Sequence, residues 1–121
     1  MLEFDAKRPI YTQLMDEMET RIASGHLEPG AKLESVRELA VLYGVNPNTV
    51  QRALSELERA GLLNTQRTNG RFVTDNQAQI KELREQMAAE QIDKLIKNLE
   101  SLGFNHQEIL ELIVKKLKEM N

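Results

Sequence analysis

The sequence predicts a mainly helical fold with a small β-wing: a winged helix-turn-helix followed by a two-helix hairpin at the C-terminus. Three observations lead to this fold class. Two short helical patterns meet at Gly44, and two strand-like runs flank the polar turn at residues 67–70. Beyond residue 75 the chain carries a long apolar stripe and has no glycine until Gly103.

The first helix is expected from Pro9 to Ser24, where apolar residues recur at helical spacing and Gly25 ends the pattern. The residues predicted to face inward are Ile10, Leu14, Met18 and Ile22. The segment Glu28–Ala31 has the proline and glycine of a type II turn. Residues 31–33 then leave room for only a short strand.

The second helix is predicted to begin at Ser35, which forms a capping box with Glu38, and to end at Tyr43–Gly44. Arg37 falls in its first turn, where the positive end of the helix dipole disfavours a cation by about 0.3–1 kcal/mol. This placement calls for a compensating anion. Glu38 supplies part of it, and a phosphate or a guanine edge would supply more.

The third helix is expected to start with Asn46 as N-cap and Pro47 at the first helical position, which needs no N–H donor. Helical spacing places four apolar residues on its buried face, namely Val50, Ala53, Leu54 and Leu57. The polar residues left on the first two turns are Asn48, Thr49, Gln51 and Arg52. Short amide and hydroxyl groups with one arginine suit contact with DNA.

A β-hairpin is predicted next, with strands at Leu62–Gln66 and Arg71–Thr74 across a turn at Arg67–Gly70. An arginine on each side of the tip is what a wing reaching into a groove would carry. The chain has a net charge of −3, but residues 35–73 hold five arginines against three glutamates, a local charge of +2. Such a polarised surface can bind DNA despite the negative total.

These motifs together resemble the GntR family of bacterial transcription regulators, in particular its short YtrA-like subgroup. The matching segments are residues 9–14, 25–33, 35–40, 45–53 and 70–73. Glu34 stands where the family usually has proline, and Thr68 where its wing usually has glycine. The resemblance implies that the arginine of the second helix reads bases, that the start of the third helix touches bases and phosphates, and that the wing enters the minor groove.

The predicted DNA-binding residues come from the two helix starts and the wing tip: Ser35, Arg37, Asn46, Asn48, Thr49, Gln51, Arg52, Arg67, Thr68, Asn69 and Gly70. Two alternatives stay open at this point. Arg52 could pair with Glu56 one helical turn later, and Arg67 could pair with Asp75 across the hairpin. Arg59 is excluded from the site, because a cation near a helix C-terminus is stabilised there without DNA.

Residues 1–75 are therefore expected to form the DNA-binding domain, and residues 76–121 a helical dimerisation region. Asn105 and Glu108 predict a capping box at the start of its second helix. A segment this short usually needs a partner, and the natural one is the same hairpin in a second subunit. The alternative is that the hairpin folds back on its own winged helix. The predicted dimerisation residues are Ile80, Leu83, Met87, Ile92, Leu95, Leu99, Leu102, Ile109, Leu112, Ile113 and Leu117.

Other chemistry finds little support. The chain has no cysteine, no secretory signal and no apolar run of ~18 residues, which favours a cytoplasmic protein without membrane contact. His26 and His106 lack metal-ligand spacing, and Ser35 is explained as a cap, so we expect no metal, no cofactor and no enzyme. A small-molecule effector of unknown identity could lodge between subunits, although no polar cluster among the inward positions defines its site.

The sequence thus predicts a homodimeric winged-helix transcription regulator, a repressor that occupies a palindromic double-stranded DNA operator. The competing class is a winged helix that serves as a protein-interaction module with the helical tail as its docking surface. Retention on DNA at low salt distinguishes the two, because only a DNA-binding protein is held and then released by salt.

Overall fold

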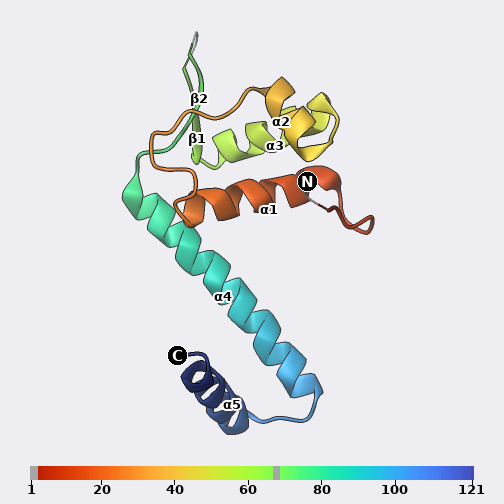
Figure 1. Cartoon of the computed structure of the whole chain (residues 1–121), viewed down its shortest axis with the longest axis vertical. Helices are drawn as coiled ribbons and strands as arrows, with labels where there is room; N and C mark the ends of the chain where they lie inside the picture. The colour runs from red at the N-terminus through yellow and green to blue at the C-terminus, as the bar shows by residue number, and fades with distance from the viewer. Residues whose placement is uncertain (1–2, 67–68) are drawn as a thin grey trace. The chain divides into compact units, whose positions relative to one another are not determined.

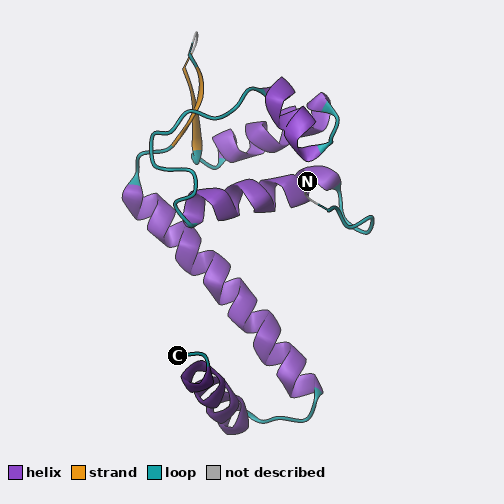
Figure 2. Ribbon diagram, in the orientation of Figure 1, coloured by secondary structure: helices purple, strands orange, loops and turns teal. Residues whose placement is uncertain are grey.

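The structure is a computed structural model that describes residues 3–66 and 69–121 (Figure 1). Its elements are α1 (Ile10–Ala23), α2 (Val36–Tyr43), α3 (Pro47–Arg59), β1 (Leu63–Gln66), β2 (Gly70–Val73), α4 (Gln77–Ser101) and α5 (His106–Glu119). Helices dominate, and one strand pair forms the wing (Figure 2). The chain divides into two compact units, Met1–Arg84 and Glu85–Asn121. The predicted fold class is confirmed.

Three helices build the core of the first unit, in which α1 and α2 both pack against α3 (Figure 1). Leu14, Met18 and Ile22 of α1 are at most 1% exposed, as the helical spacing predicts. The prediction was wrong for Ile10, which stays 44% exposed. Ile10 is the first residue of α1, and periodicity alone does not tell at which turn the packed part of a helix begins.

Both helices of the helix-turn-helix begin at the predicted caps. The hydroxyl of Ser35 accepts from the Glu38 amide at 3.1 Å, and the Glu38 carboxylate accepts from the Ser35 amide at 3.0 Å. The side chain of Asn46 accepts from the Asn48 amide at 2.8 Å. Gly44 ends α2 with a φ of 67°, the left-handed conformation that glycine adopts most readily. The predicted inner face of α3 is buried: Val50, Ala53, Leu54 and Leu57.

The wing is an antiparallel hairpin in which Leu63 pairs with Val73 and Thr65 with Arg71. The predicted type II turn is confirmed by the bond from the Ala31 amide to the Glu28 carbonyl at 3.0 Å together with the φ of 79° at Gly30. The strand expected at residues 31–33 is reduced to one bridge between Lys32 and Phe72. Backbone bonds still join this segment to β2, from the Val73 amide to Ala31 at 2.8 Å and from the Leu33 amide to Arg71 at 2.9 Å.

The first two turns of α4 belong to the first unit. Ile80 and Leu83 are 5% and 9% exposed, and the amide group of the Gln79 side chain donates to the Ala60 carbonyl at 2.9 Å. The remainder of α4 forms the second unit together with α5. There Asn105 and Glu108 make the predicted capping box, with bonds of 2.9 and 3.0 Å.

Candidate nucleic-acid interface

Arg37 extends from the first turn of α2 into solvent. Among the described residues its guanidinium has no hydrogen bond, ion pair or aromatic contact. The neighbouring Glu38 carboxylate is instead directed to Ser35, and the hydrogen bonds from the Ser35 amide and hydroxyl lower the pKa of that carboxyl. The expected contribution of Glu38 as a partner for Arg37 is therefore not seen as an ion pair. Arg37 keeps its donors available for an external anion.

The outer face of α3 carries the polar residues that the sequence placed there. Asn48, Gln51 and Arg52 are exposed, and Thr49 is half-buried. The Arg52 guanidinium stacks on the ring of Tyr11 in α1, with its central carbon 3.8 Å from the ring centroid. The alternative pairing of Arg52 with Glu56 is not found, since Glu56 pairs with Arg59 at 3.5 Å. The Tyr11 ring thus supports the Arg52 guanidinium, while the Arg52 side chain stays exposed to solvent.

Only part of the wing tip can be placed. Asn69 and Gly70 are exposed at the tip, whereas Arg67 and Thr68 lie outside the described residues, and so does the alternative pair of Arg67 with Asp75. Arg71 corrects the expectation of an arginine directed outward on each side of the tip. Its guanidinium donates to the carboxylate of Glu58 in α3, and its side chain is only 19% exposed.

The contact between α3 and the wing is a charged and partly buried one. Burial raises the pKa of Glu58, but hydrogen bonds from Arg71 and Thr65 outweigh it, so the pKa lies below the ordinary value of 4.5. The carboxylate is therefore ionised at neutral pH and accepts from Arg71 of β2. Neither Glu58 nor Thr65 was among the predicted site residues. The predicted turn at residues 67–70 places Gln66 opposite Arg71, whereas the structure pairs Thr65 with Arg71, so no local pattern pointed to this contact.

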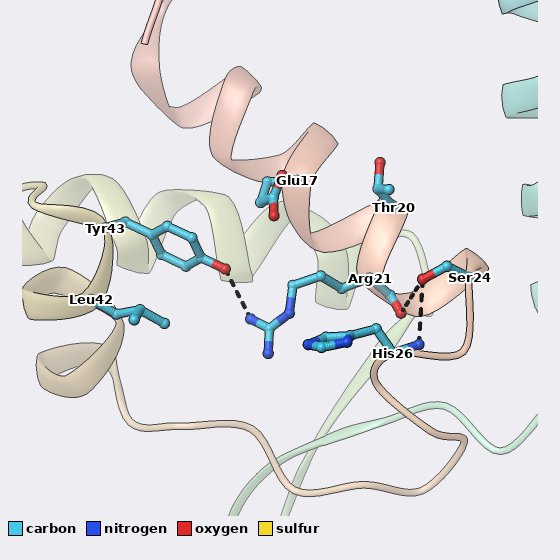
Figure 3. Close-up of a pocket in the computed structure, with 7 residues that line it drawn as sticks. All are labelled: Glu17, Thr20, Arg21, Ser24, His26, Leu42 and Tyr43. Carbon is cyan, nitrogen blue, oxygen red and sulfur yellow. Dashed lines mark hydrogen bonds between the residues drawn. The ribbon is translucent and has the colours of Figure 1, made fainter. Parts of the chain in front are cut away.

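Arg21, which was not among the predicted site residues, links α1 to Tyr43 at the end of α2 and to Glu34 before its start. Its guanidinium donates to the Tyr43 hydroxyl at 2.9 Å and pairs with Glu34 at 3.5 Å (Figure 3). Glu34, which replaces the family's usual proline, thus gains a cationic partner without disturbing the cap at Ser35. A hollow beside this contact is lined by Glu17, Thr20, Arg21, Ser24, His26, Leu42 and Tyr43 (Figure 3). Across the described part of the chain, no group of three or more His, Cys, Asp or Glu residues could hold a metal ion.

The residues predicted for dimerisation fall into three groups. Ile80, Leu83 and Ile109 are buried within the chain, the first two in the first unit. Three more are half-buried, namely Met87, Leu99 and Ile113. Five are exposed: Ile92, Leu95, Leu102, Leu112 and Leu117. Leu110 and Val114, which the sequence analysis left out, are exposed as well, at 56% and 41%.

The comparison with known proteins decides the family. The family model of the bacterial regulatory proteins of the gntR family matches residues 10–73. The chain belongs to the GntR family. It is 38% identical over 109 residues to YhcF of Bacillus subtilis, an HTH-type transcriptional regulator, with 90% of both proteins covered. It is 36% identical over 116 residues to YtrA of the same organism, an HTH-type transcriptional repressor, with 93% of this chain and 89% of YtrA covered.

Solved structures agree with this assignment. A GntR family transcriptional regulator from Listeria monocytogenes superimposes with a TM-score of 0.85 at 38% identity, and covers 93% of this chain and 98% of that one. The DNA-binding domain of AraR in complex with its operator ORR3 matches with a TM-score of 0.54 at 30% identity, over 61% of this chain and 89% of that one.

The protein is therefore a GntR-family DNA-binding transcriptional regulator and not an enzyme. The interaction-module interpretation is set aside by the same finding. No helix in the described residues has the length and apolar character needed to cross a bilayer.

Proposed function

We propose that this regulator is a homodimeric repressor that binds a palindromic operator and reads bases through Arg37. The observation that carries the proposal is the exposed guanidinium of Arg37, which has no partner among the described residues, at a helix start that disfavours a cation. An arginine donates to guanine O6 and N7 together, which is the commonest base-specific contact in DNA complexes. The AraR DNA-binding domain in complex with its operator supports the assignment by relationship.

The remaining predicted contacts position Arg37 on the duplex. We propose that Ser35, Asn46, Asn48 and Thr49 contact DNA where α2 and α3 begin, and that Gln51 and Arg52 do so on the outer face of α3. The exposed wing residues Asn69 and Gly70 complete the interface with Arg67 and Thr68. Hydrogen bonds to phosphates fix register and orientation, whereas base edges carry the specificity.

Dimerisation is proposed for the second unit, with its exposed apolar residues as the contact surface. Charged or polar side chains do not cover Ile92, Leu95 and Leu117, which are 53%, 43% and 58% exposed. A second copy of the same helices would bury these residues, and a twofold dimer of winged helices matches a palindrome. Ile80 and Leu83 are already buried in the first unit, so the proposed surface begins beyond them.

Repression is proposed because YtrA, which matches over nearly its full length, is a transcriptional repressor. A dimer bound at a promoter blocks polymerase by occupancy and needs no further domain. The protein would then act in the bacterial cytoplasm, where the DNA lies. A small-molecule effector between subunits stays a prediction.

The test compares Arg37→Ala with Arg59→Ala, a control that removes an arginine 78% exposed at the far end of α3. The probe is the tightest duplex that the wild-type protein selects from a random pool. Arg37→Ala should weaken binding to this duplex by about 1–3 kcal/mol and change binding to random DNA little, while Arg59→Ala changes neither much. Equal losses on both DNAs would show that Arg37 only holds phosphate.

A further inference from the structure

Glu58 lies where the recognition helix meets the wing. Its carboxylate accepts from the Arg71 guanidinium of β2, and Thr65 of β1 helps to lower its pKa. Arg71 and Glu58 are 19% and 30% exposed, so their ion pair is less screened by water than one at the open surface. One side chain of α3 therefore holds β2, next to Thr65 of β1.

The register of the hairpin explains why Thr65 lies beside the ion pair. Thr65 and Arg71 are directly opposite each other in the antiparallel pair, so their side chains stand on the same face of the wing. Rotating the wing about its long axis would turn this face away from α3 and lengthen the bond between Glu58 and Arg71. The ion pair therefore restrains the orientation of the hairpin as well as its distance from α3.

The position of Glu58 on α3 relates this contact to the proposed DNA surface. Gln51 and Glu58 are seven residues apart and thus lie on the same side of α3, separated by about 10.5 Å along the axis. Glu58 lies C-terminal to the exposed residues that we propose to contact DNA, and its carboxylate is bonded to Arg71 of the wing. A carboxylate would repel a DNA phosphate, so we do not expect Glu58 to contact DNA.

We infer that Glu58 is a positioning residue that sets the angle between the recognition helix and the wing through its ion pair with Arg71. The inference rests on the proposed function, because it assumes that both elements contact the same duplex. Arg71 is assigned to this contact, and its charge is neutralised by Glu58. The wing's share of binding then depends on Glu58 although Glu58 does not touch the DNA.

The chain offers a matched control for the test. Glu56 lies on the same helix, pairs with an exposed arginine and has no bond to the described residues of the wing. We compare Glu58→Gln with Glu56→Gln on the selected duplex, with its flanks made A·T-rich or G·C-rich. If the wing enters the minor groove as the family resemblance implies, Glu58→Gln should lose roughly tenfold in affinity and most of the preference between flanks. Glu56→Gln should keep both.

Exchange of the charges separates positioning from simple electrostatics. Glu58→Arg and Arg71→Glu should each weaken binding, whereas the double variant Glu58→Arg/Arg71→Glu has the wild-type net charge and should regain flank preference. Base discrimination that depends on Arg37 should survive in every variant that folds. If Glu58→Gln fails to fold, Thr65→Val removes the hydroxyl beside the Glu58 carboxylate. This variant should show a smaller loss of affinity and of flank preference.

A second measurement needs no DNA. The chain contains no cysteine, so Ser55→Cys on α3 and Gln66→Cys on β1 can carry a spin-label pair. Labelled subunits are mixed with excess unlabelled chain to avoid distances between subunits. The distance distribution should be narrow with Glu58 in place and broader in Glu58→Gln.

The outcomes separate the two proposals. A wild-type protein that selects no duplex refutes the proposed function, and the spin labels then decide the role of Glu58 alone. A Glu58→Gln variant with a narrow distance distribution and intact flank preference overturns the inference. A uniform loss on every duplex, in parallel with a loss of helical signal, also overturns it and leaves Glu58 a folding residue only.

Discussion

In Met1–Arg84 the large apolar side chains of α1 and α3 pack into a closed core, and Met18, Val50 and Leu54 are at most 1% exposed. In Glu85–Asn121, all of which the structure describes, Ile109 alone is buried. The two units thus differ in where their stability comes from. The first has its own core, whereas the second exposes the residues that ought to stabilise it, and segments below about 40 residues seldom fold without such help.

The comparison separates recognition from assembly. A DNA-reading surface must keep its shape before DNA arrives, so its side chains are supported by a core, by caps and by contacts such as Arg52 on Tyr11. A contact surface between identical chains has its complement in the second copy and can stay apolar until the copies meet. The predictions below start with the change that should separate the units most.

Leu95→Glu should have the largest effect, because a dimer would bury the introduced carboxylate without a partner. We expect monomers in sedimentation and about a hundredfold weaker binding to a full palindrome, since two linked half-sites gain from effective concentration. Affinity for a half-site should change little. Asn98→Glu is the control, because it adds the same charge to an exposed polar position of α4. A dimeric Leu95→Glu protein would remove α4 from the proposed interface.

Truncation tests where the first unit ends. A chain of residues 1–84 should be monomeric and more stable to urea than a chain of residues 1–75, by about 3 kcal/mol. The reason is that Ile80 and Leu83 are buried, and burying each such side chain contributes about 1.5–3 kcal/mol. Equal stabilities would support the predicted boundary after Asp75. A chain of residues 1–84 that remains dimeric would contradict the assignment of dimerisation to the second unit.

Acid should loosen the wing of the first unit before its helical core. The pKa of Glu58 is lowered in the folded protein, so its stabilisation is complete above the ordinary value of 4.5 and is lost as the pH falls through the folded value. Wild type and Glu58→Gln should differ by roughly 1–2 kcal/mol at pH 7, and their melting temperatures should converge below pH 4.5. A constant difference across that range would assign the effect to packing.

The smallest effect is expected from Tyr11→Leu, which removes the ring under Arg52. A cation–π contact at an exposed site is worth about 0.5–1 kcal/mol, and the loss should appear in binding to operator and random DNA alike if Arg52 holds phosphate. Tyr11→Phe keeps a ring and serves as the control. Fluorescence anisotropy at two salt concentrations measures both. A loss confined to the operator would make Arg52 a base reader.

Local chemistry made much of the first unit predictable. The two capping boxes, the N-cap at Asn46 and the type II turn each depend on residues no more than four positions apart. The inner face of α3 follows from one helical period. For the same reason the capping box of Ser35 and Glu38 is enough to place Arg37 in the first turn of α2.

Contacts between distant segments could not be predicted in this way. Glu58 and Arg71 are 13 positions apart, and Arg21 meets Tyr43 across 22. Ile80 and Leu83 continue the apolar stripe of α4 without a break, so nothing in the period shows that the first unit buries them. Arg52 has a suitable glutamate one turn away, yet it contacts Tyr11 in another helix.

The segment between α1 and α2 has a consequence for how the protein is made. Residues 30–33 bond to β2 through Gly30, Ala31 and Leu33, about 40 residues earlier in the chain than their partners. The three helices can form and collapse while the chain is still being synthesised, because all of their residues precede the wing in the sequence. The wing cannot, since its strands and this segment close only after residue 73 has left the ribosome. A nascent regulator therefore acquires its helix-turn-helix before the wing that lies beside it.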